Sequence, residues 1–228
     1  MNDLFQEYMS KRLSEIDFDK LKTRPGPIVT ISRAAGCSSS HLSHKLAKKL
    51  NLVEPSYKWE VISKEILHES AERLQLHPEH IKKIIKTKDK SFLDEVLQAF
   101  MSRDYHLERK TVKTIKEVIH DFAIDGHKIF IGRGAYIICS DIRDAIHVRI
   151  DAPLEWRINK MVQTKGKNYA EAAETIRKIE NDRKNYLATL KGRPVQYEDF
   201  DLTINQSKYN SDEMTEIVYT ALHLKKIV

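Results

Sequence analysis

Glycine is scarce in this sequence. It supplies 7 of the 228 residues, about 3%, whereas proteins contain roughly 7% on average. The composition therefore excludes collagen-like and low-complexity chains. Cysteine is scarcer still, because Cys37 and Cys139 alone are too few for a disulfide-stapled scaffold or a cysteine zinc cage. Each glycine that remains is expected to hold a backbone position that a side chain would disturb.

Long apolar runs are also missing. No run approaches the roughly 18 residues of a membrane helix, and residues 1–24 lack the apolar core of a secretion signal. Two cysteines also suit a reducing compartment. We therefore expect a cytoplasmic protein with no membrane partner.

Charge of one sign does not dominate. The chain has 39 Lys and Arg residues against 33 Asp and Glu residues, a formal net charge of +6. This mild basicity suits phosphorylated metabolites, nucleotides or nucleic acid. The lysines are dispersed, and their densest stretch, residues 81–90, interleaves them with isoleucine as in an amphipathic helix. This dispersal argues against nucleic acid as a partner, which is the weakest of these alternatives, and leaves phosphorylated metabolites and small-molecule nucleotides open.

The spacing of apolar residues divides the chain into helices and short strands. Residues 1–24 have helical spacing, and the sequence Arg24-Pro25-Gly26-Pro27 ends that helix. Short β-branched or apolar runs predict strands at 28–32, 128–131, 145–150 and 201–205. Further helices are predicted over 42–50, in four segments from 60 to 124, from Pro153 to about 164, over 169–190, and from Ser211, as the N-cap, to about 224.

Short apolar strands that alternate with helices are typical of an α/β fold with a mostly parallel sheet. We expect a three-layer sandwich, with helices on both faces of the sheet. Ligands bind such sheets at the carboxyl ends of the strands. In this chain those ends are 32–40, 132–133, 151–152 and 205–207.

The segment after the first strand, residues 33–40, has the composition of a phosphate-binding loop. Such a loop needs backbone N–H groups at a helix N-terminus together with a cation. The segment offers small residues, one glycine (Gly36) and a cation (Arg33). It does not match the Walker A pattern, so a serine-rich capping turn is the alternative. Cys37 lies where a helix N-terminus lowers the pKa of a thiol, and Ser40, or else Ser38, offers the oxygen that Mg²⁺ prefers.

Several segments follow one another in an order that resembles a known family. They are residues 28–33 with the small-residue loop after them, 62–67, Gly132-Arg133-Gly134, 148–157, Asp182-Arg183 and 201–208. Taken together over residues 27–222, they resemble the cytidylate kinase-like family of P-loop proteins and, more distantly, CMP kinases.

The resemblance implies a P-loop kinase-like domain over residues 25–228, after a helical extension over 1–24. Within that domain it implies a helical segment for nucleoside monophosphate binding at 58–124 and a lid-type segment at 155–192. The implied reaction transfers a phosphoryl group from ATP to a nucleoside monophosphate, with CMP as the leading candidate and Mg²⁺ as the metal.

Roles for single residues follow from the resemblance and from the positive charge that phosphoryl transfer requires. Nucleotide binding is expected of Ala35, Gly36, Cys37, Ser38, Ser39 and Ser40. Catalysis is expected of Arg33, Arg157 and Arg183. Acceptor binding is expected of Ser63, Lys64, Gly132, Arg133 and Asp182. Each arginine also has a structural alternative, as a surface or helix ion pair or, for Arg133, as part of a turn.

The loop departs from the CMP kinase pattern where that pattern has its lysine. Arg33 stands in place of the first glycine, Ser39 in place of the lysine and His41 in place of a threonine. We predict that Arg33 supplies the missing charge, because no other Lys or Arg occurs between residues 25 and 44. The alternative is a nucleotide-binding or regulatory protein with little or no kinase activity. The apolar side of residues 1–24 favours a homodimer contact, or else it covers the sheet.

Overall fold

The structure is a computed structural model that describes residues 26–63, 116, 119, 120 and 122–228. The predicted helix over 1–24, the acceptor-binding candidate Lys64 and most of the segment at 58–124 lie outside the described residues. The helical segments predicted between 64 and 115 therefore stay predictions, as does the homodimer contact.

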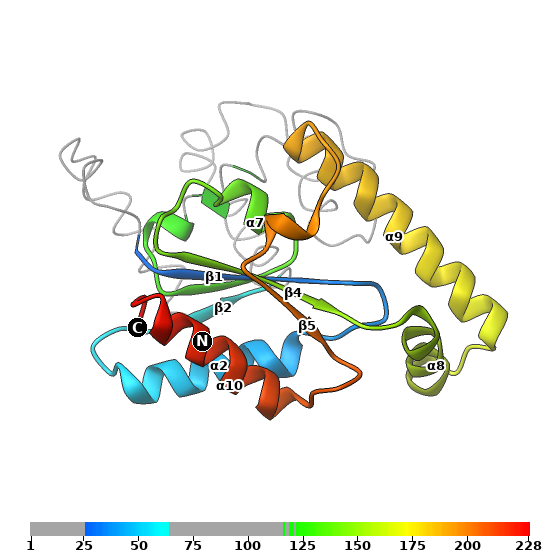
Figure 1. The fold of residues 1–228 in the computed structure, drawn as a ribbon, viewed down its shortest axis with the longest axis horizontal. Coiled ribbons are helices and arrows are strands. Elements are labelled where there is room, and N and C mark those ends of the chain that lie inside the picture. The colour runs from blue at the N-terminus through cyan, green and yellow to red at the C-terminus, as the bar shows by residue number, and fades with distance from the viewer. Residues whose placement is uncertain (1–25, 64–115, 117–118, 121) are drawn as a thin grey trace, which may run out of the picture.

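Five parallel strands form one sheet in the order β2-β3-β1-β4-β5 (Figure 1). They are β1 (Ile28–Arg33), β2 (Glu60–Ile62), β3 (Lys128–Ile131), β4 (Ala145–Asp151) and β5 (Leu202–Asn205). The prediction of an α/β fold with a parallel sheet is confirmed, and the four predicted strands lie within one residue of their expected bounds.

The strand β2 corrects the sequence prediction, which places a helix from residue 60 onward. Residues 60–62 instead pair with β3, with Val61 opposite Ile129 and Ile62 opposite Phe130. A buried ion pair between Glu60 and Lys128, with 2.9 Å between Oε2 and Nζ, joins the two strands at the same level. So short an apolar run fits the spacing of either element, and the pairing with β3 decides between them.

Helices cover both faces of the sheet, as predicted (Figure 1). The helices α2 (Ser40–Val53) and α10 (Ser211–Leu224) pack on one face, and α7 (Ala135–Ile138) and the 3₁₀ helix η2 (Tyr197–Asp199) lie on the other. The helices α8 (Leu154–Lys165) and α9 (Tyr169–Lys191) follow the carboxyl end of β4. The described residues include no helix that is long and apolar enough to cross a membrane.

Asparagine side chains determine where α9 and α10 begin. Asn168 accepts a hydrogen bond from the backbone N–H of Glu171 (2.9 Å), whose carboxylate accepts one from the N–H of Asn168. Asn210 and Glu213 form the same reciprocal pair at α10. The prediction that Ser211 caps this helix is therefore wrong by one residue, because the preceding side chain reaches the free N–H groups first.

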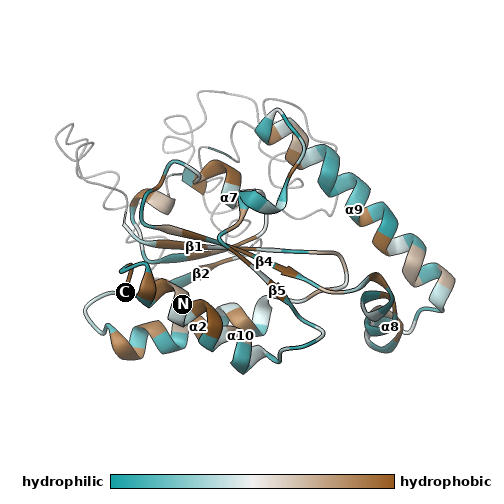
Figure 2. Ribbon diagram, viewed as in Figure 1, coloured by the Kyte–Doolittle hydropathy of each residue, from teal (hydrophilic) through white to brown (hydrophobic). Residues whose placement is uncertain are grey.

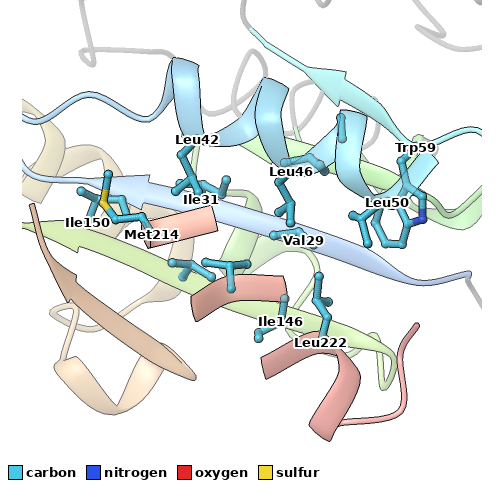
Figure 3. Packing of buried hydrophobic residues seen from close by; sticks show 14 of the residues in the cluster. Val29, Ile31, Leu42, Leu46, Leu50, Trp59, Ile146, Ile150, Met214 and Leu222 are labelled. Atoms are coloured by element: carbon cyan, nitrogen blue, oxygen red, sulfur yellow. The ribbon is translucent and has the colours of Figure 1, made fainter. Parts of the chain in front are cut away.

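The main core lies between the sheet and the pair α2 and α10 (Figure 3). Residues four apart, Leu42, Leu46 and Leu50, project from α2, and α10 presents Met214, Val218 and Leu222 in the same way. Figure 2 shows apolar stretches that alternate with polar ones along both helices. From residue 146 onward burial alternates along β4, so that residues 146, 148 and 150 face this core while 147, 149 and 151 face the opposite side.

Substitution of two leucines of α2 by alanine separates the contribution of core packing to stability from that of helix propensity. Leu46 is fully buried, whereas Leu52 is 72% exposed. We expect Leu46→Ala to lower the free energy of unfolding by about 2–5 kcal/mol, because it leaves a cavity, and Leu52→Ala to change it by less than about 0.5 kcal/mol. Urea denaturation followed by circular dichroism measures both. Equal losses in the two variants would contradict the packing described here.

Candidate functional site

A cavity of about 720 Å³ opens at the carboxyl ends of β1, β3, β4 and β5. The chain leaves β1 toward β2 and β3 on one side and later places β4 on the other, so the cavity lies at the point where the strand order reverses. Six cationic side chains and two carboxylates of the described residues line it: Arg33, Arg133, Arg149, Arg157, Arg183, Lys184, Asp151 and Glu180. The excess of positive charge favours an anionic ligand.

Three consecutive residues with positive φ form the turn after β3. The φ angles of Gly132, Arg133 and Gly134 are 72°, 55° and 69°. For an arginine this conformation costs roughly 1–2 kcal/mol, and such strain concentrates at functional sites. A Cβ at Gly132 would collide with Nη1 of Arg33, so the glycine leaves room for that guanidinium. The turn therefore brings two arginines together at the ends of β1 and β3.

The helix α9 supplies side chains to this cavity at intervals of three residues. Glu180 contacts Arg157. One turn later Arg183 Nη1 donates to the backbone oxygen of Arg33 (2.7 Å), and after another turn Tyr186 Oη donates to that of Arg133 (3.2 Å). Because residues three apart share a helix face, one face of α9 holds the ends of both strands.

Arg157 holds the loop after β1 in place. Its guanidinium is buried and donates from Nε to the oxygen of Ala152 (2.8 Å) and from Nη1 to that of Ala35 (3.0 Å). It also pairs with Glu180. Gly36, with φ of 89°, lies directly against the backbone of Arg157, where a Cβ would be 3.0 Å from its oxygen. These contacts give Arg157 a positioning role, and its catalytic role stays a prediction.

The structure thus gathers part of the predicted site. Arg33, Gly132, Arg133, Arg157 and Arg183 all line the cavity. The acceptor-binding candidates Ser63 and Asp182 are half-buried but do not line it.

Sequence reasoning missed the pair formed by Arg149 and Asp151. Nη2 of Arg149 lies 2.9 Å from Oδ2 of Asp151, and the guanidinium carbon is 5.7 Å from the ring centre of Phe200 and 5.9 Å from that of Tyr197. All four residues line the cavity. The alternation of apolar and polar residues from 146 to 151 was the signal, because it places both charged residues on the face away from the core.

The end of the loop lies at a second, smaller cavity of about 250 Å³, whose lining includes Ser38, His41, Trp156, Lys160, Gln206 and Tyr209. Ser38 is bound twice by Gln206: its N–H donates to Oε1 (2.9 Å), and its oxygen accepts from Nε2 (2.7 Å). The nucleotide-binding candidates are therefore divided. Ala35 and Gly36 contact Arg157, Ser38 lines the smaller cavity, and Ser39 is buried while Ser40 is exposed.

The expectation that the helix N-terminus lowers the pKa of the Cys37 thiol is wrong. Burial raises the pKa of Cys37 from 9.0 to about 11, because desolvation outweighs the opposite effect of Arg157 and Lys160. Burial also raises the pKa of Cys139 to about 12. Both thiols are free in the structure and are held in the protonated form.

A family model and one solved structure agree with this fold. The family model described as "Cytidylate kinase-like family" matches residues 28–208. A crystal structure of an uncharacterized protein from Eubacterium ventriosum ATCC 27560 is similar, with 18% identity and a TM-score of 0.59, over 86% of this chain and 98% of that one. The crystal structure of TT1252 from Thermus thermophilus has 14% identity and a TM-score of 0.41, over 89% of this chain and 98% of that one. No curated protein matches the sequence.

Two glycines test the close contact between the loop and α8. Gly36 and Gly166 both have positive φ, but a Cβ would meet α8 only at Gly36, since none of the described residues lies within 4 Å of a Cβ at Gly166. We expect Gly166→Ala to lower the free energy of unfolding by about 1–2 kcal/mol from backbone strain. Gly36→Ala should lower the free energy of unfolding by about 1–3 kcal/mol more than that, because its Cβ also overpacks the contact with Arg157. Urea denaturation compares the two, and similar losses would argue against the contact.

The reactivity of Cys37 reports its pKa. A pKa of about 11 in place of 9.0 leaves about 100-fold less thiolate at pH 8. We expect iodoacetamide to alkylate Cys37 at least about 100-fold more slowly in the folded protein than in urea, with a rate that keeps rising up to about pH 11. Mass spectrometry of the labelled peptide measures this rate. Faster labelling in the folded state would show that the pKa is lowered instead.

Proposed function

The chain belongs to the cytidylate kinase-like family, and on that premise we propose that it transfers a phosphoryl group from ATP to a nucleoside monophosphate, with CMP as the first acceptor to test. One observation carries the proposal. Arg33, Arg133 and Arg183 line a single cavity at the carboxyl ends of the strands, next to the loop that leads into α2.

The larger cavity suits the acceptor. A phosphate monoester carries about 1.5–2 negative charges at neutral pH, and a guanidinium binds it through two parallel hydrogen bonds. Arg133 in its strained turn is the candidate for holding this phosphate. Arg33 and Arg183 are the candidates for stabilising the charge that develops during transfer. They are held together because Arg183 donates a hydrogen bond to the backbone oxygen of Arg33.

The loop residues 34–40 suit the phosphates of the donor. Loops of small residues before a helix present backbone N–H groups and hydroxyls to phosphate oxygens. The loop begins at the larger cavity, which Ala34 lines, and reaches the smaller one at Ser38. A donor bound along the loop would therefore point its terminal phosphate toward the acceptor.

The donor set around the loop fits Mg²⁺. The described residues contain no group of three or more His, Cys, Asp or Glu side chains that could hold a metal ion. Mg²⁺ that is bound mainly by phosphates and water needs only one or two protein oxygens. The exposed hydroxyl of Ser40, at the first residue of α2, is the candidate ligand. When bound, such an ion would neutralise negative charge on the phosphate oxygens.

A nucleotide-binding protein with little turnover is the second candidate. Ser39 stands where the resemblance expects a lysine, and the guanidinium of Arg33 lies against Gly132, on the β3 side of the site. The guanidinium of Arg157 is held by two carbonyls and a carboxylate. This arrangement favours binding over rapid transfer, and the replacement of the lysine by Arg33 stays a prediction.

A coupled assay of ADP release tests the kinase proposal, with Mg·ATP and a panel of nucleoside monophosphates. We expect at least one acceptor to raise ADP release, and Arg133→Gln to lower kcat/KM for that acceptor by about 100-fold or more, since one well-placed cation is worth that much. The control is Arg177→Gln on α9, whose exposed side chain pairs with Glu174 and should change kcat/KM less than about twofold.

The same preparations decide between the two candidates. If no acceptor raises ADP release above background while calorimetry detects nucleotide binding, the kinase proposal fails and the binding protein is favoured. If the two arginine variants lose activity equally, the role of Arg133 is wrong.

A further inference from the structure

The side chain of Gln206 joins three separate parts of the chain. Its Oε1 accepts one hydrogen bond from the backbone N–H of Ser38 (2.9 Å) and a second from Nζ of Lys160 (3.1 Å). Its Nε2 donates to the oxygen of Ser38 (2.7 Å). Ser38 belongs to the loop after β1, Lys160 to α8 and Gln206 to the segment after β5.

An oxygen that accepts from a loop N–H and from an ammonium group has the surroundings of a phosphate oxygen. Backbone N–H groups of small-residue loops and lysine ammonium groups are the usual donors to phosphate. Here a neutral amide oxygen occupies the point where both donors converge. A phosphate oxygen would form stronger hydrogen bonds there, because it carries a negative charge.

Among the residues that the structure describes, Lys160 has no carboxylate partner within ion-pair distance, and its side chain is half-buried. Its ammonium lies 4.5 Å from the ring centre of Trp156. Partial burial lowers the pKa of Lys160 from its usual value. A half-buried ammonium whose polar partner is an amide gains from the arrival of an anion.

The nearby arginines are directed elsewhere. Arg157 is held by Ala35, Ala152 and Glu180, and Arg33 lies against Gly132. Lys160 therefore brings positive charge to the Ser38 end of the loop, in a region where the loop itself has serine in place of lysine.

We propose that Gln206 Oε1 occupies a phosphate-oxygen position of the donor site, and that a bound nucleoside triphosphate displaces it to accept from Ser38 N–H and Lys160 Nζ. This inference rests on the proposed nucleotide-binding function and adds a residue, Lys160, that supplies the charge missing from the loop. It also makes Gln206 an internal competitor of the nucleotide.

The exchange requires movement of one side chain only. The backbone N–H of Gln206 donates to the oxygen of Asp151 (2.7 Å), and Asn205 Oδ1 accepts from the backbone N–H of Ser207 (3.0 Å). These bonds hold the segment after β5 without the side chain of Gln206. The cavity of about 250 Å³ beside it gives that side chain room to rotate.

Isothermal titration calorimetry tests the proposal with two probes, a non-hydrolysable ATP analogue and inorganic tripolyphosphate. We expect Lys160→Met to weaken the binding of both probes at least about 10-fold and Lys160→Arg to restore most of it. Gln206→Ala should strengthen binding about 3- to 10-fold, because the competitor is gone. The controls Lys165→Met and Gln163→Ala change exposed side chains of α8 and should bind within twofold of the wild type.

The outcomes separate this inference from the proposed function. If the wild type binds the analogue and Lys160→Met binds it equally well, the role of Lys160 is overturned. If Gln206→Ala binds more weakly, Gln206 is a ligand-binding residue and not a competitor. If neither the wild type nor Gln206→Ala binds either probe, nucleotide binding itself fails. Thermal denaturation checks that each variant is folded. If Gln206→Ala does not fold, the binding measured for Lys160→Met tests the proposal by itself.

Discussion

The buried guanidinium of Arg157 is the contact on which the arrangement of both cavities depends. It joins the loop after β1, the end of β4 and the helix α9 through Ala35, Ala152 and Glu180. A buried guanidinium must keep its hydrogen-bond partners, because it has lost its water and cannot release its proton. The absence of a side chain at Gly36 allows the loop to approach α8 closely enough for these bonds to form.

The two cavities that this contact separates have different chemical surroundings. The larger one collects arginines from β1, the turn after β3, β4 and α9, so that it suits the compact charge of a phosphate group. The smaller one combines the end of the loop with Lys160, Trp156 and Tyr209. On the proposed function, a loop that begins at one cavity and reaches the other would bring the two bound nucleotides close to each other.

Part of the site was predictable because chemistry and local sequence coincide there. Gly132, Arg133 and Gly134 stand at a strand end, where two glycines permit a tight turn, and the structure places all three in the left-handed region. Arg149, Lys160 and Gln206 were not predicted as site residues. Each is a common polar residue in an ordinary strand, helix or turn, and part of its importance comes from neighbours that are distant along the chain, such as Phe200 for Arg149 and Gln206 for Lys160.

The sequence by itself determined the parallel α/β sheet, four of its strands, the helices on both faces and the strand ends at which the larger cavity opens. These features follow from apolar spacing and turn residues, which act over short distances along the chain. The tertiary structure decided that residues 60–62 form a strand, that Arg33 lies against Gly132 and that Arg157 holds the loop. It also decided that the pKa of Cys37 rises instead of falling. Burial and pairing with distant residues cause all four, and neither can be read from local spacing.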